Sequence, residues 1–195
     1  MYSCYIDYIM HINSIFVKIW NINIHTQKIY ENLNIPKSIP KKFLFFLLSD
    51  GSCSRNLAAL QGINTHIKLY NQEILFTCPD SFVSISYNNY LHRKVWLTNN
   101  KINKLAFAES YWKLYHDPYN ILYQNNHEPV GKIFITSEKD IHRNLQNIYC
   151  GYSALLNKEL HNSNLLWGRS YNIVLNNKVT IFMHEIFSSF LLNNL

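Results

Sequence analysis

The sequence is poor in glycine, proline and charged residues. Of 195 residues, 5 are glycine and 5 are proline, and Asp, Glu, Lys and Arg together make up 15%. Disordered chains combine low hydrophobicity with high charge, so an apolar fraction of 48% excludes that class. The longest strongly apolar run, Phe43 to Leu48, is far shorter than the roughly 20 residues that a membrane-spanning helix needs. We therefore predict a soluble, folded protein without a membrane span.

Several chemical signatures are also missing. The 4 cysteines (Cys4, Cys53, Cys78 and Cys150) lie far apart with no Cys-x-x-Cys pair, which argues against a zinc site and against a dense disulfide framework. The chain contains no Gly-x-Ser-x-Gly, Gly-x-Gly-x-x-Gly, phosphate-loop or His-Glu-x-x-His pattern. Motif-bearing hydrolases, dinucleotide enzymes and zinc proteases of these types are therefore not indicated.

The net charge of +6 raises the question of a nucleic-acid partner. Lys and Arg are scattered, and no dense basic run or aromatic RNA-binding signature accompanies them. The richness in Asn, Ile, Lys and Tyr is typical of an AT-rich genome. We expect no nucleic-acid partner. We attribute the positive net charge to biased codon usage together with the binding of a small anionic ligand.

The length suits one domain with one core. The segment "NIPKSIPKK" contains two prolines that interrupt regular structure. We predict an N-terminal arm, residues 1–36, packed on a main domain of residues 37–195. The first twenty residues lack a basic start and a small-residue cleavage site, so they are not interpreted as a signal peptide.

A helix, a turn and a second helix are predicted at the start of the main domain. The pattern from Ser38 to Leu48 is typical of a short buried helix, which Asp50-Gly51 ends. Ser52 or Ser54 then supplies a cap for another short helix, since serine oxygens accept from free N–H groups at helix starts.

The rest of the chain has the alternation of strands. "THIKLY" alternates apolar residues, and "RKVWLTNNKINKLAFAES" reads as two strands joined at Asn99-Asn100. "SYNIVLNNKVTIFMHEIF" repeats this arrangement with a turn at Asn176-Asn177, because Asn tolerates the positive φ of tight turns. These hairpins predict an α+β fold with a single antiparallel β-sheet and helices packed on it, largely on one face.

Two charged residues on the predicted strands are candidate site residues. Arg93 stands near the entry of its strand and offers a planar fork to a carboxylate, although a surface arginine would look the same in sequence. Glu185 closes an apolar strand, where it is either a partly desolvated functional carboxylate or a structural one. His184 directly precedes it and must point to the other face of the sheet.

Further candidates are weaker. In "EPVG", Pro129 suits the first turn of a helix and leaves the N–H groups of Val130 and Gly131 free to bind a carboxylate, or it simply marks a turn. Arg169 faces either the same site or a surface acid. Cys53 lies near a helix start, where packing explains it better than nucleophilic catalysis does.

The segments "LLSDGSCSRNL", "RKVWL", "EPVG", "LWGRSY" and "HEIF", in this order, resemble those of chorismate pyruvate-lyases. The resemblance runs from about Phe43 onward, and it is strongest to members encoded in algal plastid genomes. It implies an antiparallel sheet with helices that close an internal ligand pocket. It also implies conversion of chorismate to 4-hydroxybenzoate and pyruvate by a plastid enzyme that uses no metal and no organic cofactor.

The resemblance also assigns residues. Arg93 and the backbone N–H of Val130, with Gly131 beside it, would hold the ring carboxylate, while Glu185 would meet the 4-hydroxyl end. Apart from the resemblance, Arg169 is a candidate for holding the second carboxylate as it leaves, and Cys53 is a further candidate substrate-binding residue. The chain departs from the pattern at Ala106-Phe107-Ala108, where bacterial lyases carry an arginine in an "AGR" segment. Lys104, Lys113 and Arg169 are candidate replacements for that charge.

An alternative of another class stays open. Effector-sensing domains of some bacterial transcription regulators resemble the same fold and bind small ligands without chemistry. A carrier or sensor of an aromatic acid is therefore the second hypothesis, and a basic RNA-associated plastid protein is the third. For the first two we expect a monomer whose partner is a small carboxylate, chorismate or 4-hydroxybenzoate.

Overall fold

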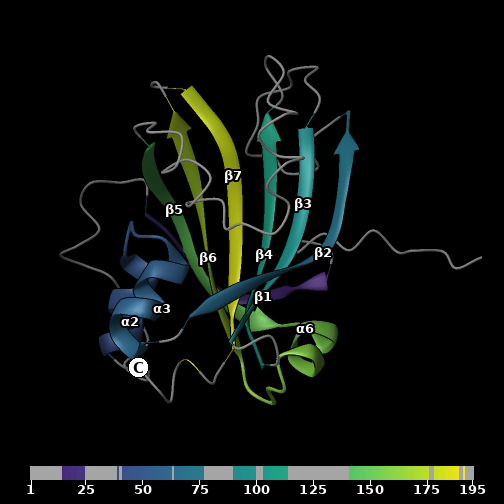
Figure 1. Ribbon diagram of the computed structural model, residues 1–195. Coiled ribbons are helices and arrows are strands. Elements are labelled where there is room, and N and C mark those ends of the chain that lie inside the picture. Colours follow the sequence, from purple (N-terminus) through teal and green to yellow (C-terminus); the bar gives the residue numbers. More distant parts are fainter. Residues whose placement is uncertain are drawn as a thin grey trace, which may run out of the picture.

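The fold was established from a computed structural model, which describes residues 15–24, 39, 41–62, 64–76, 90–99, 103–113, 141–175, 178–188 and 191. Figure 1 shows one strongly curved sheet with short helices against it. In chain order the described elements are β1 (Val17–Asn23), α2 (Lys41–Leu48), α3 (Cys53–Gln61), β2 (Thr65–Leu75), β3 (Tyr90–Asn99), β4 (Asn103–Lys113), β5 (Ile141–Tyr152), α6 (Ala154–Glu159), β6 (Leu166–Leu175) and β7 (Lys178–Phe187).

Among the described residues, the sheet has seven strands in the order β1-β5-β6-β7-β4-β3-β2, and every neighbouring pair is antiparallel. The predicted hairpins are confirmed as β3–β4 and β6–β7, and β4 pairs with β7 to join them. Their expected turn residues Asn100, Asn176 and Asn177 lie outside the described residues. The predicted α+β class with a single antiparallel sheet is therefore correct.

The helix, turn and helix are confirmed as α2 and α3. Ser52 is the N-terminal cap residue of α3, with extended backbone, but its side chain makes no capping hydrogen bond. Ser54 lies inside α3. Gly62 ends the helix at φ 65°, a left-handed conformation that glycine adopts without strain.

The two faces of the sheet carry different cores, because side chains alternate along each strand. The larger cluster joins Phe43, Phe46 and Leu57 of α2 and α3 to Val95 and Phe187 of the sheet. On the other face, Leu156 of α6 packs into a second, aromatic-rich cluster that consists of Phe16, Trp96, Phe107, Tyr149, Leu156, Leu160, Leu166 and Ile186. The helices thus lie largely on one face, as predicted, with α6 as the exception.

Two strands were not predicted. β5 pairs with β6 along its length, and β1 pairs with β5 at the edge of the sheet. β1 lies within the predicted arm of residues 1–36, so at least this part of the arm belongs to the sheet. No helix in the described part of the chain is long and apolar enough to cross a membrane.

Candidate functional site

A buried ion pair lies under the larger core cluster. Arg169 of β6 and Glu185 of β7 are opposite each other in the strand register, and Arg169 Nε donates to Glu185 Oε2 at 2.8 Å. The hydroxyl group of Tyr171 donates to Glu185 Oε1 at 3.0 Å. Both carboxylate oxygens are therefore held by protein groups, and Arg169 and Glu185 are only 1% and 4% exposed.

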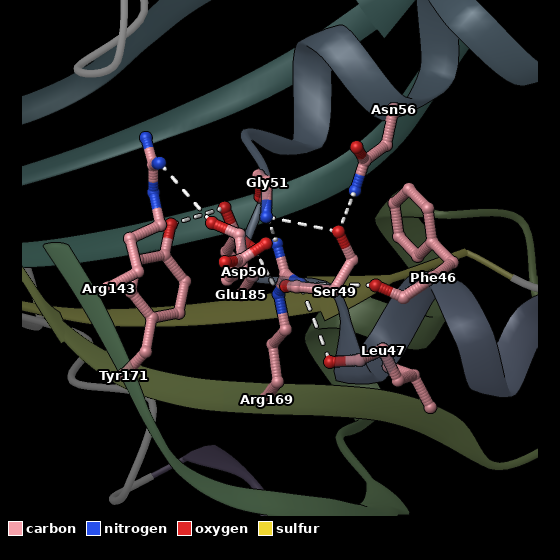
Figure 2. Close-up of polar contacts among 10 residues, drawn as sticks. All are labelled: Phe46, Leu47, Ser49, Asp50, Gly51, Asn56, Arg143, Arg169, Tyr171 and Glu185. Carbon is pink, nitrogen blue, oxygen red and sulfur yellow. Dashed lines mark hydrogen bonds and ion pairs between the residues drawn. The ribbon is translucent and has the colours of Figure 1, made fainter.

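The guanidinium group of Arg169 also caps the C-terminal end of α2 (Figure 2). Arg169 Nη1 donates to the carbonyl oxygens of Phe46 at 3.1 Å and Ser49 at 2.6 Å, with a longer contact to Leu47 at 3.4 Å. Its Nη2 donates to the carbonyl oxygen of Gly51 at 3.4 Å. Carbonyl groups at a helix end have no partner within the helix, and a cation suits the negative end of the helix dipole. Arg169 thereby fixes the turn between α2 and α3 to the sheet.

This network joins three of the sequence segments that carry the family resemblance. Ser49 and Gly51 come from "LLSDGS", Arg169 from "LWGRSY" and Glu185 from "HEIF". Gly168 permits the close approach, since a Cβ there would lie 2.8 Å from the backbone oxygen of Glu185. The segments therefore share a structural role, in addition to any chemistry.

Opposing effects act on the pKa of Arg169. Burial lowers it, but the negative charge of Glu185 and the hydrogen bond to it raise it, and the net result is a pKa above the usual value. A buried ion pair stabilises a fold only when further hydrogen bonds compensate for lost hydration. The carbonyl groups around Arg169 and the hydroxyl group of Tyr171 supply that compensation.

A hollow lies between α3 and this face of the sheet. It measures about 460 Å³ with the part open to solvent included, and about 40 Å³ of it is wide enough for water. It is lined by Ser52, Cys53, Ser54, Ile67, Arg93, Val95, Leu97, Ala108, Arg143, Tyr171, Ile173, Met183 and Glu185. We call it the α3 cavity. An apolar wall with a few convergent charges is typical of sites for small organic anions.

Arg93 lies deep in this wall rather than at a strand entry. It is the fourth residue of β3 and is 3% exposed, so the surface alternative is wrong. Burial lowers the pKa of Arg93 from its ordinary value, because a desolvated guanidinium loses hydration. A bound carboxylate would offset that loss and could accept two hydrogen bonds from the planar group.

Glu185 likewise lies within its strand, third from the end of β7, and is followed there by Ile186 and Phe187. It lines the α3 cavity, while His184 belongs to the other face, as the alternation predicts. Ala108 pairs with Glu185 in the register and lines the same cavity. The small side chain of Ala108 leaves space beside the carboxylate.

Cys53 contributes an uncharged side chain to the wall of the α3 cavity. Burial, and then the charge of Glu185, raise the pKa of its thiol well above the usual value, with a smaller opposite effect from Arg169. The thiolate form that a nucleophile needs is therefore disfavoured. A protonated thiol packs as a small apolar group with a weak hydrogen-bond donor.

The predicted residues are brought together only in part. Cys53, Arg93 and Glu185 line the same cavity, whereas Arg169 lies behind Glu185 and is not among the lining residues. Val130 and Gly131 lie outside the described residues.

Arg143 of β5 is a lining residue that sequence reasoning missed. The apolar and polar alternation around it could have revealed β5, but a shift in register between Leu145 and Asn147 interrupts that pattern.

Two proposed replacements for the missing arginine lie elsewhere. Lys104 forms an ion pair with Glu159 and lies 4.5 Å from the ring centroid of Trp96, on the face that α6 covers. Lys113 lies 5.6 Å from the ring centroid of Phe182. Neither lysine is among the residues that line the α3 cavity. The cations that line that cavity, within the part of the chain that the structure describes, are arginines on β3 and β5.

The opposite face of the sheet also buries charge. His92 Nδ1 lies 3.0 Å from Glu73 Oε1, and its Nε2 lies 2.7 Å from Glu109 Oε1. The hydroxyl group of Tyr111 donates to Glu109 at 3.0 Å, and its ring stacks on His92 at 4.5 Å between centroids. We call these four residues the His92 cluster. Their polar atoms are bonded to one another.

A roomier hollow lies on that opposite face beside α6, with about 220 Å³ wide enough for water. It is lined by Lys68, Leu69, Tyr70, Trp96, Lys104, Phe107, Leu155, Leu156 and Glu159. Lys104 and Glu159 pair with each other there, which leaves Lys68 as the remaining lining cation, whereas two arginines line the α3 cavity. We therefore regard the smaller α3 cavity as the candidate site, because its charges are better suited to a ligand.

Comparison with known proteins identifies relatives of similar length. The "Uncharacterized protein ycf21" of Antithamnion sp. is 36% identical over 167 residues, which cover 86% of this chain and 88% of that one. The protein of the same name from Porphyra purpurea is 34% identical over 179 residues, 91% of this chain and 97% of that one. The predicted resemblance to plastid-encoded algal proteins is confirmed.

Among solved structures, the effector domain of PhnF from Mycobacterium smegmatis matches 72% of this chain and 90% of its own, with a TM-score of 0.57 and 12% identity. The possible transcriptional regulator YydK from Bacillus subtilis matches 65% of this chain and 59% of its own, with a TM-score of 0.53 and 13% identity. These similarities concern the fold alone. A family model described as "Chorismate pyruvate-lyase Rv2949c-like" matches residues 47–195. The chain therefore belongs to the Rv2949c-like chorismate pyruvate-lyase family.

Proposed function

We propose that this protein binds chorismate in the α3 cavity and eliminates pyruvate from it to give 4-hydroxybenzoate. The observation that carries the proposal is the meeting of Arg93 and Glu185 in one largely apolar cavity, from strands far apart in sequence. Family membership supports this choice of reaction over others that an anion site permits.

Arg93 is the proposed anchor of the ring carboxylate. Its guanidinium offers parallel N–H donors, and the apolar neighbours Val95 and Leu97 strengthen the attraction by excluding water. The backbone N–H of Val130, with Gly131, remains the proposed second donor to the same carboxylate. The hydrophobic lining suits the carbon ring between the two polar ends of the ligand.

Glu185 is the proposed partner of the substrate's hydroxyl group. Its two oxygens each accept one hydrogen bond from the protein, at 2.8 Å and 3.0 Å, and an ionised carboxylate has about four acceptor positions. It therefore retains capacity to accept from a ligand. Arg169 and Tyr171 hold it in place, so that its orientation exists before the ligand binds.

In the proposed reaction, the bond between the ring carbon and the ether oxygen breaks while the hydroxyl-bearing carbon loses its hydrogen. The ring becomes aromatic, and the departing enolpyruvate gains a proton at its methylene carbon to become pyruvate. Glu185 would either accept the ring proton and return it, or hold the hydroxyl group while the proton moves within the substrate. No metal or organic cofactor takes part in this scheme.

The ligand requires the cavity to open. About 40 Å³ of the cavity is wide enough for water, of which one molecule needs roughly 10 to 15 Å³ by this measure, but that space is too small for an aromatic acid. The N-terminal residues Ser52, Cys53 and Ser54 at the start of α3 form one wall. We propose that outward movement of this end of α3 admits the ligand, so that the helices close the pocket afterwards.

The alternative function is a sensor or carrier of an aromatic acid. The observation that favours it is that Glu185 already bonds to Arg169 and Tyr171, which suits a binding wall as well as a catalytic one. The protein would then bind 4-hydroxybenzoate without turnover. In either case we propose a monomer located in the plastid, as the algal relatives suggest.

The test is incubation of purified protein with chorismate, with pyruvate and 4-hydroxybenzoate quantified together by chromatography. We expect stoichiometric formation of both, and loss of activity of at least about tenfold in Arg93→Ala, which removes a charge-assisted contact. Product at only the spontaneous rate, together with saturable binding of 4-hydroxybenzoate, would overturn the lyase and establish the sensor or carrier.

A further inference from the structure

The α3 cavity is lined by a second arginine, Arg143, in addition to Arg93. Arg143 belongs to β5 and Arg93 to β3, with β6, β7 and β4 between them in the sheet order. Neighbouring strands lie about 4.8 Å apart, so the two strands are roughly 19 Å apart along the sheet. Only the curvature of the sheet, visible in Figure 1, allows both side chains to reach one cavity.

Arg143 is partly exposed and makes few hydrogen bonds within the described part of the chain. Its Nη1 donates to the backbone oxygen of Asp50 at 3.3 Å, a long hydrogen bond to a neutral group (Figure 2). Its Nε is buried and has no hydrogen-bond partner among the described residues. Because a guanidinium carries five N–H donors, most of the donor capacity of Arg143 is not used within the described structure.

The contrast with Arg169 shows what a structural arginine looks like in this fold. Arg169 bonds to a carboxylate and to four backbone oxygens, and it lies behind the cavity wall. Arg143 lines the cavity and, within the described part of the chain, has no carboxylate partner. A lining position with spare donors is what ligand binding requires of such a residue.

The charged groups on the cavity wall also suit one class of ligand. Glu185 is paired with Arg169, and the two lining arginines, Arg93 and Arg143, come from strands well apart in the sheet. A monoanion would contact one of these guanidinium groups. A dianion with its two carboxylates at opposite ends would contact both.

We infer that Arg143 binds the second carboxylate of a dianionic ligand, opposite the carboxylate that Arg93 holds. The inference rests on the proposed function and deepens it, since Arg143 takes the side-chain carboxylate of the substrate while Arg169 positions Glu185. The use of two separate arginines for the two carboxylates also explains how the products are released. Cleavage divides the two carboxylates between two monoanions, each of which is held by a single arginine.

The test compares two stable ligands by calorimetric titration. The dianion 3-(carboxymethoxy)benzoate carries a ring carboxylate and an ether-linked carboxylate, and 3-methoxybenzoate is the matched monoanion. We expect wild-type protein to prefer the dianion by at least about tenfold, because the second carboxylate adds charge-assisted hydrogen bonds. Arg143→Gln should remove this preference and leave the affinity for the monoanion within about twofold.

Two further variants serve as controls. Arg143→Lys keeps the charge without the planar fork and should recover part of the preference. Arg55→Gln makes the same change of charge at an exposed position of α3 and should leave the preference intact. Equal weakening of both ligands in Arg143→Gln, an unchanged preference, or no binding of the dianion to wild-type protein would overturn the inference.

Failure of the Arg143 inference can be distinguished from failure of the proposed lyase function. A preference for the dianion that depends on Arg143, without turnover of chorismate, would refute the lyase and keep the dianion site. Turnover of chorismate with an unchanged KM and an unchanged dianion preference in Arg143→Gln would refute the role of Arg143 alone.

Discussion

The two faces of the sheet bury charge in different ways. On the face covered by α2 and α3, Arg93 and Glu185 border the α3 cavity. On the other face, the polar atoms of the His92 cluster bond to one another at 2.7 to 3.0 Å. Burial and charge are therefore common to both faces. What distinguishes the candidate site is that two guanidinium groups, those of Arg93 and Arg143, and the carboxylate of Glu185 line one largely apolar cavity.

A polar row crosses the opposite face at one level of the sheet. Lys94 pairs with Glu109, Glu109 with His184, His184 with Ser170, and Ser170 with Asn147 in the register of five strands. All five side chains are buried. Such a row specifies strand register, since a slip of one residue would place these groups among the aromatic side chains of the core. We interpret it as a structural feature.

The largest expected effect is on the cavity face, where Arg169→Met would leave Glu185 buried without its partner and the α2 carbonyl groups without donors. The loss of stability should be about 3 to 5 kcal/mol, the usual result of breaking a buried pair from one side. Urea denaturation of the two proteins measures it. The double variant Arg169→Met/Glu185→Leu should recover part of the loss. A single variant as stable as wild type would contradict the network.

The next effect concerns the His92 cluster. Glu109→Gln removes the charge beside His92 and should cost about 1 to 3 kcal/mol of unfolding free energy. Because Glu109 lies on the face away from the α3 cavity, the dissociation constant for 4-hydroxybenzoate should stay the same. Calorimetric titration checks this. A tenfold weaker affinity would show that the two faces are not separate in function.

The pKa of Cys53 gives a smaller, pH-dependent effect. Burial raises this pKa in the folded protein above the roughly 8.5 of an unfolded thiol. The folded state therefore retains a proton that the unfolded state loses, and the contribution to stability is full below about pH 8.5 and declines as pH rises above it. Cys53→Ala should reduce the loss of stability between about pH 8 and 10, measured by thermal unfolding. An unchanged alkaline slope would contradict the assignment.

The smallest effect is expected at the surface ion pair beside α6. The hydrogen bond from Lys104 is the main reason that the pKa of Glu159 is lowered, with burial opposing it. A lowered pKa means that the stabilisation is present above about pH 4.3 and is lost as pH falls through the lower folded value. Glu159→Gln should cost about 0.5 kcal/mol or less at pH 6 and nothing at pH 3. The same cost at both pH values would exclude the ion pair as its cause.

The sequence predicted the elements whose signals are local. Apolar alternation and Asn-Asn turns predicted both hairpins, and Asp50-Gly51 correctly separated α2 from α3. β5 was missed because its polar residues and its shift in register hide the alternation. The short helix α6 was missed as well, although Ser153 caps it through a hydrogen bond to the N–H of Leu156.

The site was less predictable, because it depends on contacts between distant residues. Arg169 bonds to the carbonyl oxygen of Ser49, which lies 120 positions earlier in the chain, and no local pattern signals that contact. Arg93 was a candidate by resemblance, but the sequence could not distinguish a buried from a surface position. Arg143 reaches the cavity only through the curvature of the sheet, a global property that single strands do not reveal.

The most direct test of the account uses two neighbours on β3. Arg93 and Lys94 are buried cations at 3% and 1% exposure, and the alternation of the strand places them on opposite faces. We would measure the affinity of 4-hydroxybenzoate for Arg93→Met and Lys94→Met by calorimetric titration, after circular dichroism has established that both are folded. We predict a loss of about tenfold or more in Arg93→Met and no change in Lys94→Met. Equal affinities in the two variants, or a loss in Lys94→Met alone, would contradict a carboxylate site on the cavity face.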